Sequence, residues 1–133
     1  MQLHYITCQP DDDRFWWESH VQLNNARQLG ISNKFRILVF TPPDREPNGV
    51  NHKWLELEKT FPEAKFSFYF DRAGVLDDIK LANYIPLLRP YLLTRHFKEY
   101  PELVNDAIFY IDGDVLFTKP LDWVEKYVQD DVN

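Results

Sequence analysis

The chain alternates between short, almost continuous apolar runs and longer segments in which apolar residues recur every three or four positions. Short runs rich in β-branched and aromatic residues are typical of strands, and the longer recurrence is typical of amphipathic helices. The pattern predicts strands at Leu3–Cys8, Phe35–Phe40, Lys65–Phe70 and Ala107–Ile111. Between them it predicts helices at Arg14–Leu29, His52–Phe61 and Tyr84–Glu99.

Acidic and turn-forming residues mark the ends of these elements. Pro10 is expected to end the first strand. The acidic run Asp11–Asp13 favours the start of the first helix, because carboxylates accept hydrogen bonds from the free N–H groups of a helix N-terminus. Gly30 is expected to end that helix. Loops are predicted at Thr41–Gly49 and Asp71–Asp78.

The order of elements indicates the fold class. The runs Phe35–Phe40 and Ala107–Ile111 are nearly all apolar, which is typical of strands buried on both faces of a parallel sheet. Alternating strands and helices predict an α/β fold, a Rossmann-like, open and mostly parallel sheet with helices on both faces. No repeat or linker divides residues 1–133, so a single domain is expected. Val115–Phe117 is expected to be extended, and Leu121–Tyr127 to add a final helical turn or two.

Composition narrows the classes of protein to consider. Of the 133 residues, 44% are apolar and 16% aromatic, which supplies a packed core and excludes wholesale disorder. A net charge of −6 argues against binding nucleic acid by neutralising phosphates. The single cysteine, Cys8, excludes an internal disulfide and a cysteine-rich zinc site. Neither a membrane span nor a signal peptide is visible, so the cytoplasm is the expected location.

The strongest chemical signal is Asp112-Gly113-Asp114, at the carboxyl end of the last apolar run. Ligands of open α/β sheets bind at the edge where the parallel strands end. Two carboxylates one residue apart repel one another, and a divalent cation that prefers oxygen ligands relieves the repulsion. The motif therefore favours a Mn²⁺ or Mg²⁺ site, with Gly113 allowing backbone or ligand to approach closely. The alternative is that both acids merely cap the strand and the following turn.

The run Ala107–Trp123 (AIFYIDGDVLFTKPLDW) resembles the DxD segment of GT-A-fold glycosyltransferases, which are nucleotide-diphospho-sugar transferases. It is closest in style to the glycogenin-like group. Tyr84–Tyr100 is similar to the helix with a basic residue that precedes the DxD strand in that family. Family members are usually considerably longer, and their acceptor-binding half and a further metal ligand follow that strand. The resemblance therefore covers the N-terminal donor-binding half and implies a truncated GT-A fold.

The resemblance also implies roles for individual residues. Asp112 and Asp114 would hold Mn²⁺ or Mg²⁺ against the diphosphate of an NDP-sugar, where the metal stabilises the leaving nucleoside diphosphate. Asp112 would also face the ribose or the sugar, and Gly113 would be a further donor-binding residue. Arg89 would pair with phosphate or sugar, its alternative being a solvated arginine on a helix face. The remaining donor-binding candidates are Asp71, for base or ribose, and Thr7, Cys8 and Gln9, for the base pocket.

Structural roles are expected for the other titratable residues that attract attention. Arg95 and His96 are predicted to lie at the surface. His4, in a strand, and His20, in a helix stripe, are predicted to be structural. No activating base is evident near Cys8, so its thiol is expected to be a small, inert, buried group.

The implied reaction is metal-assisted transfer of a hexose from a UDP-sugar or other NDP-sugar to an unidentified acceptor. One alternative is a non-catalytic nucleotide-sugar-binding remnant, or a half domain that depends on a partner. A second is a phosphatase of the haloacid dehalogenase type, with Asp112 as nucleophile and Asp114 as acid and base. That motif normally opens its domain, whereas here it comes late in the chain.

The family fold places the DxD strand at the centre of a larger sheet. In this chain Ile108, Tyr110, Val115 and Phe117 would have few neighbours, and the outer edge of their strand would be unpaired. Unpaired edges and exposed apolar patches favour association. The sequence therefore predicts self-association or a partner on this side, the alternative being that Leu121–Val132 folds back as a helix over it.

Overall fold

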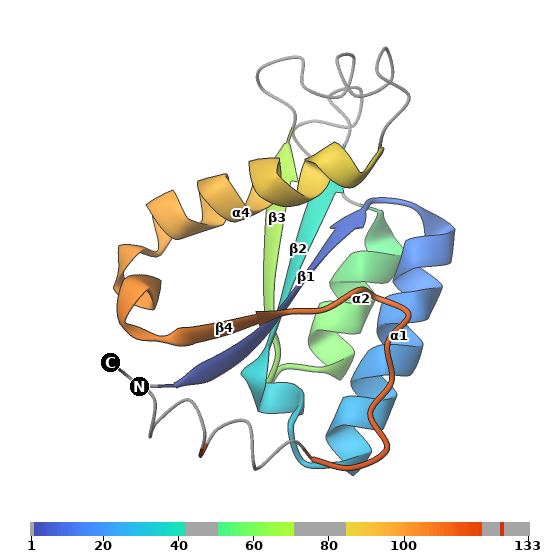
Figure 1. The fold of residues 1–133 in the computed structure, drawn as a ribbon. Coiled ribbons are helices and arrows are strands. Elements are labelled where there is room, and N and C mark those ends of the chain that lie inside the picture. Colours follow the sequence, from blue (N-terminus) through green and yellow to red (C-terminus); the bar gives the residue numbers. More distant parts are fainter. Residues whose placement is uncertain (1, 42–50, 71–84, 121–125, 127–133) are drawn as a thin grey trace.

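The structure is a computed structural model that describes residues 2–41, 51–70, 85–120 and 126. Four parallel strands form one sheet in the order β3-β2-β1-β4 (Figure 1). The strands are β1 (Leu3–Pro10), β2 (Phe35–Thr41), β3 (Lys65–Phe70) and β4 (Ala107–Tyr110). The α-helices are α1 (Asp13–Gln28), α2 (His52–Thr60) and α4 (Leu88–Glu99). These elements confirm the open, parallel α/β fold predicted from the alternating pattern.

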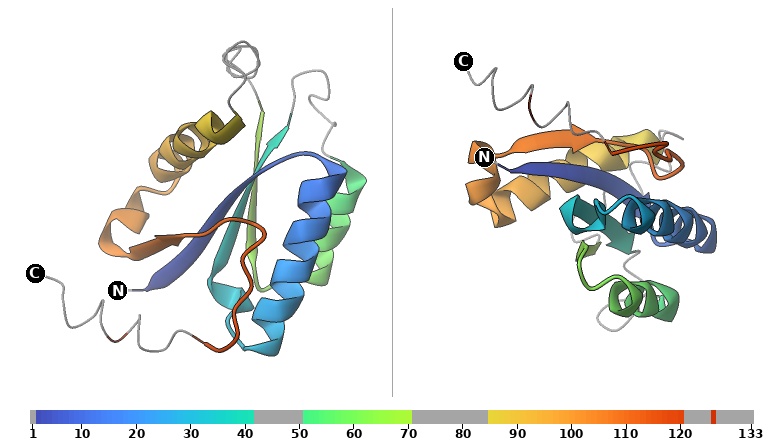
Figure 2. Two further views of the ribbon diagram at one scale, coloured as in Figure 1. Left: turned by 45° about the vertical axis from the view of Figure 1, so that its right-hand side comes forward. Right: turned by 90° about the horizontal axis from the view of Figure 1, so that it is seen from below.

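Helices cover both faces of the sheet, as expected (Figure 2). On one face α1 and α2 bury side chains such as Leu23 and Trp54 against Tyr5 and Ile37 of the strands. On the other face α4 packs Leu88 and Leu92 against a second apolar cluster that includes Ile6, Leu38 and Phe40. None of the helices in the described part of the chain has the length and apolar character needed to cross a bilayer.

The strand order creates a switch point beside β1. The chain first moves outward from β1 to β2 and β3, and then α4 carries it back to the opposite side of β1, where β4 pairs. Thus Ile6 has Arg36 as its neighbour on β2 and Tyr110 as its neighbour on β4. Ligands of open α/β sheets bind in the crevice above such a point, because the connections there diverge to opposite faces.

Strand β1 runs through Pro10, where the sequence predicted a stop. The backbone N–H of Asp11 donates to the carbonyl of Phe40 at 2.8 Å, so the odd-numbered residues of β1 direct their N–H groups to β2. The nitrogen of Pro10 therefore points toward the β4 side. Strand β4 ends at Tyr110, opposite Ile6, so no ladder hydrogen bond is lost at the proline.

Helix ends follow local chemistry. The side chain of Asp12 accepts a hydrogen bond from the N–H of Arg14 at 2.8 Å and caps α1. Gly30, with φ of 74°, follows that helix in the left-handed region that glycine favours. Pro86 lies in a short 3-10 turn before α4, and Pro90 lies in the first turn of α4. Neither proline removes an N–H that the helix needs, so α4 forms without a break.

Strand β4 is less buried than its apolar sequence predicted. Phe109 is 40% exposed, and Ile108 and Tyr110 are only partly buried. The reason is position, because β4 lies at the edge of the sheet and pairs only with β1 among the described strands. The segment Val115–Phe117, expected to be extended, belongs to no strand. Three further predictions, on the loops 42–49 and 71–78 and on the helical turns at 121–127 apart from Lys126, lie outside the described residues.

His96 was predicted to lie at the surface, and this prediction is wrong. Its side chain is fully buried, with Nδ1 at 2.7 Å from the hydroxyl of Tyr69 and Nε2 at 3.2 Å from a guanidinium nitrogen of Arg36. Arginine only donates, so Nε2 accepts and Nδ1 carries the proton. Burial, reinforced by the nearby charge of Arg36, lowers the pKa of His96 to about 4. Arg95 is likewise partly buried and donates to the carbonyl of Phe70 at 2.6 Å.

Stability is expected to depend on pH through His96. Between pH 6.5 and about 4 the unfolded chain binds a proton on this imidazole and the folded chain does not. The free energy of unfolding therefore falls as the pH is lowered through this window, by up to about 1.4 kcal/mol per pH unit from this group. Urea unfolding at several pH values should show a shallower slope for His96→Gln than for the wild type. Parallel slopes in the two proteins would contradict a neutral, buried His96.

Candidate functional site

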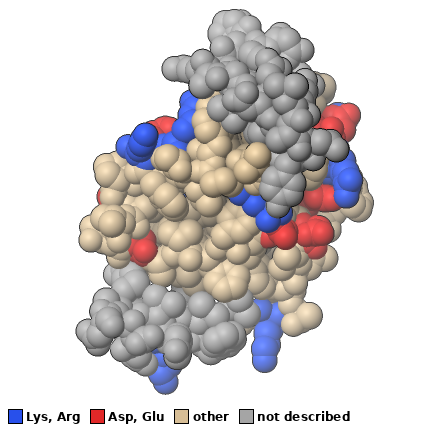
Figure 3. Space-filling view, turned by 45° about the horizontal axis from the view of Figure 1, so that its top comes forward, with Lys and Arg blue, Asp and Glu red and all other residues tan. Residues whose placement is uncertain are grey.

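A cavity of about 180 Å³ opens at the carboxyl ends of β1 and β4, at the switch point of the sheet. In the space-filling view that brings this end of the molecule forward, acidic and basic groups lie next to one another (Figure 3). Most of the residues predicted as ligands from the sequence line this cavity together: Cys8, Gln9, Arg89, Asp112, Gly113 and Asp114. Residues up to 106 positions apart in the sequence thus meet where the fold predicts a ligand.

Arg89 faces the DxD motif, as predicted. A guanidinium nitrogen of Arg89, near the start of α4, lies 2.8 Å from a carboxylate oxygen of Asp112. Its guanidinium carbon also lies over the ring of Tyr110, at 5.4 Å from the ring centre. The side chains of Arg89 and Asp112 are 45% and 49% exposed, so solvent weakens this pair and both groups can still contact a ligand.

Gln9 and Gly113 form the floor of the cavity. Gln9 is almost completely buried, and its amide nitrogen donates to the hydroxyl of Thr7 at 2.7 Å. A Cβ atom at Gly113 would collide with this amide. The side chain of Gln9 therefore occupies the space that the missing Cβ of Gly113 leaves, where the sequence had suggested backbone or a ligand. Thr7 is fully buried behind Gln9 and does not line the cavity, so it supports the floor instead of facing a ligand.

Cys8 presents a neutral thiol to the cavity. Burial raises its pKa to about 12, and the opposing effect of the nearby Arg89 guanidinium is smaller. A thiol that stays protonated is a poor nucleophile and a poor metal ligand. Cys8 thus contributes shape and weak polarity, which agrees with the inert role expected from the sequence. Asp71, the last predicted donor-binding residue, lies outside the described residues.

Two side chains of α1 hold the segment that carries the DxD motif. The amide nitrogen of Gln22 donates to the carbonyls of Asp112 and Val115, at 2.9 and 2.8 Å. Asn25 makes a reciprocal pair with the backbone of Phe117, at 2.9 and 2.8 Å. These bonds replace the sheet hydrogen bonds that the chain lacks after β4. They fix the position of both motif carboxylates relative to the cavity.

The two motif acids supply an incomplete set of metal ligands. Asp112 and Asp114 are both exposed at the rim, and one oxygen of Asp112 already contacts Arg89. The described part of the chain contains no group of three or more histidine, cysteine, aspartate or glutamate side chains placed to hold a metal ion. Mg²⁺ and Mn²⁺ are often bound by one or two carboxylates together with substrate phosphates and water. The residues present fit a cation that arrives with a phosphate-bearing ligand.

Three cavity residues were not anticipated from the sequence: Arg14, Phe15 and Glu18, from the first turns of α1. Arg14 Nε lies 3.4 Å from a carboxylate oxygen of Glu18. Glu18 is four residues from Arg14 and three from Phe15, and these spacings make it a neighbour of both on the helix surface. The sequence did contain a signal for these residues, because α1 follows β1 directly and a helix that follows a strand starts at the carboxyl edge of the sheet.

Comparisons of the chain with models of known protein families, with curated proteins and with solved structures found no significant match.

Substituting Gly113 by alanine is expected to destabilise the floor of the cavity. The added methyl group must displace the Gln9 amide from Thr7, and a lost buried hydrogen bond costs about 1 kcal/mol or more of unfolding free energy. The same substitution in a Gln9→Ala background should cost less, because nothing then occupies the space. Urea unfolding of the four proteins gives the coupling. Equal costs in both backgrounds would contradict the proposed contact.

Proposed function

We propose that this domain binds the diphosphate of a nucleoside-diphosphate sugar at the β1–β4 edge, with a divalent cation, and transfers the sugar to an acceptor. The observation that carries this proposal is the convergence of Arg89, Asp112 and Asp114 on one cavity at the switch point. The DxD motif contributes two carboxylates, and α4 contributes the guanidinium of Arg89, whose side chain is 45% exposed. The similarity of the DxD segment to that of GT-A glycosyltransferases supports the choice of donor.

The charges around the cavity favour a cation and an anion bound together. Its lining holds two guanidinium groups, of Arg14 and Arg89, and the three carboxylates of Glu18, Asp112 and Asp114. A diphosphate alone would meet excess negative charge, and a cation alone would meet two positive groups and few ligands. A cation between the motif carboxylates and the phosphates satisfies both sides.

Each of the chain's own groups has a separate task in this proposal. Asp112 and Asp114 hold the cation, which supplies Lewis-acid stabilisation of the leaving diphosphate when bound. Arg89 is held in place by Asp112 and by the face of Tyr110, so its remaining N–H groups are oriented before a phosphate arrives. Phe15 and the neutral groups of Cys8 and Gln9 offer the less polar wall, which suits the base.

The cation and the nucleotide are expected to bind cooperatively. Because the protein supplies few ligands, Mn²⁺ alone should bind weakly, and UDP should bind at least tenfold more tightly with Mn²⁺ than with EDTA. Asp114→Asn should remove most of this gain, whereas Glu102→Gln, at an exposed acid far from the cavity, should not. Titration calorimetry of UDP binding to the wild type and the two variants, each with Mn²⁺ and with EDTA, measures all six combinations. Equal UDP affinity with Mn²⁺ and with EDTA would contradict the proposal.

Loss of Arg89 is expected to weaken diphosphate binding specifically. Arg89→Ala should cost about 1.5–3 kcal/mol of UDP affinity, the value of a hydrogen bond to a charged group. Uridine, which lacks the phosphates, should bind the variant and the wild type alike. Lys98→Ala removes an exposed positive charge from the same helix and serves as the control. A similar loss for uridine and UDP would place Arg89 outside the phosphate site.

Turnover assays separate the alternatives left by the sequence. Cleavage of a UDP-hexose to UDP supports the transferase. Metal-dependent UDP binding without turnover favours a non-catalytic binding domain. Release of phosphate from simple phosphomonoesters, abolished by Asp112→Asn, would instead favour a phosphatase with Asp112 as nucleophile.

A further inference from the structure

No strand among the described residues pairs with the outer edge of β4, and β4 itself carries no charged residue and no proline. Its residues Ala107–Tyr110 pair with β1, and no other strand among the described residues pairs with the opposite side. Natural proteins usually protect such edges with lysine, proline or bulges, because exposed N–H and C=O groups recruit another strand. The sequence of β4 contains none of these protective features.

The hydrogen bonds to β1 show which groups face outward. The N–H of Ala107 donates to Gln2, and the N–H of Ile111 donates to Ile6, at 2.8 and 2.9 Å. Odd-numbered residues therefore direct their backbone groups to β1. It follows that Ile108 and Tyr110 direct both N–H and C=O away from the sheet, toward the free edge.

This pattern is self-complementary. In an antiparallel pair of two β4 strands, Ile108 of each copy can lie opposite Tyr110 of the other, and each such pair exchanges two hydrogen bonds. The two-fold axis then passes between the two copies of Phe109. Phe109 is 40% exposed, and side chains at such a non-hydrogen-bonded position approach closely across the strands.

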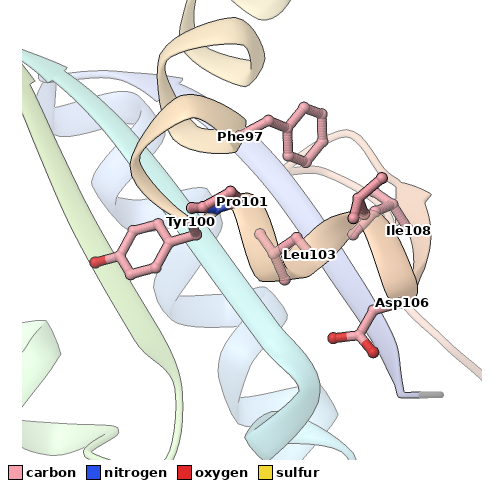
Figure 4. A pocket seen from close by; sticks show the side chains of 7 residues that line it. Phe97, Tyr100, Pro101, Leu103, Asp106 and Ile108 are labelled. Carbon is pink, nitrogen blue, oxygen red and sulfur yellow. The ribbon is translucent and has the colours of Figure 1, made fainter.

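An apolar cavity of about 660 Å³ lies beside this edge, on the α4 face of the sheet. Phe97 of α4, Leu103 and Ile108 surround it, and Asp106 lies at its end (Figure 4). In the antiparallel register, Tyr110 of the second copy lies opposite Ile108, on the same face as this cavity. The cavity therefore offers space for a phenol ring.

Charge opposes the pairing at the two ends of the strands. The register brings Asp106 of one copy toward Asp112 of the other, and like charges that face one another across strands are destabilising. Arg89, 2.8 Å from Asp112, and His4, 2.9 Å from Asp106, offset part of this repulsion.

We propose that two copies of this chain associate through antiparallel pairing of β4, with Phe109 on the two-fold axis, to form one continuous eight-stranded sheet. This proposal is independent of the proposed function. The sequence predicted either self-association or a partner on this side of the chain. The present proposal names a second copy of the chain as the molecule that pairs with β4.

Three measurements on the full chain test this pairing. Sedimentation velocity over a range of concentrations should show a reversible monomer–dimer equilibrium, and Phe109→Lys should weaken it at least tenfold by placing two charges opposite one another. Phe109→Cys should form a disulfide dimer on mild oxidation, because Cα atoms about 4.5 Å apart across the strands suit a disulfide. The amides of Ile108 and Tyr110 should exchange with solvent more slowly as the protein concentration rises.

Matched controls exclude effects on folding. Leu55, on α2, is also 40% exposed, so Leu55→Lys and Leu55→Cys test the same chemistry away from the edge and should change nothing. Circular dichroism verifies that each variant folds. A chain that stays monomeric at all concentrations, with unprotected Ile108 and Tyr110 amides, would overturn the proposal and assign this edge to another occupant. A dimer that Phe109→Lys leaves intact would overturn it as well.

Discussion

Strand β1 is paired on both sides, and the candidate site depends on that constraint. Its pairing with β2 extends to Pro10, whereas its pairing with β4 ends at Ile6. The last residues of β1, after Ile6, therefore have β2 as a neighbour on one side but no paired residue of β4 on the other. The chain after β4, the first turns of α1 and Arg89 from α4 border the gap without filling it. A cavity at this place is a direct result of two neighbouring strands that end at different heights.

Helix α1 compensates for the shortness of β4. When the chain leaves the sheet after Tyr110, its carbonyl groups still need donors, because burying an unpaired polar group costs free energy. Gln22 and Asn25 provide the hydrogen bonds from the inner face of the helix. Two polar residues on a face that otherwise packs Leu23 and Ala26 are thereby explained. At these two positions the helix makes hydrogen bonds in place of apolar contacts, and these bonds hold the segment after β4 in position.

The fold and the centre of the site were predictable because both depend on local signals. Apolar or alternating runs located the four strands of the described residues, and an acidic pair after the last run located the carboxyl edge. What was missed depends on contacts between distant residues. The burial of His96 requires Tyr69 and Arg36 from two strands, and the exposure of Phe109 follows from the place of β4 in the sheet. Thr7 has the right position along β1 but lies behind the side chain of Gln9.

The bonds from α1 to the DxD segment also constrain how the chain acquires its structure. Gln22 and Asp112 are 90 residues apart in the sequence, and Asn25 and Phe117 are 92 apart. Contacts between residues so far apart in the sequence form late in folding, because other structure must first offset the entropic cost of closing a long loop. The β1–α1–β2 unit, with its short connections, is suited to form early. During synthesis the motif carboxylates would therefore reach their final positions only after the rest of the described sheet had assembled.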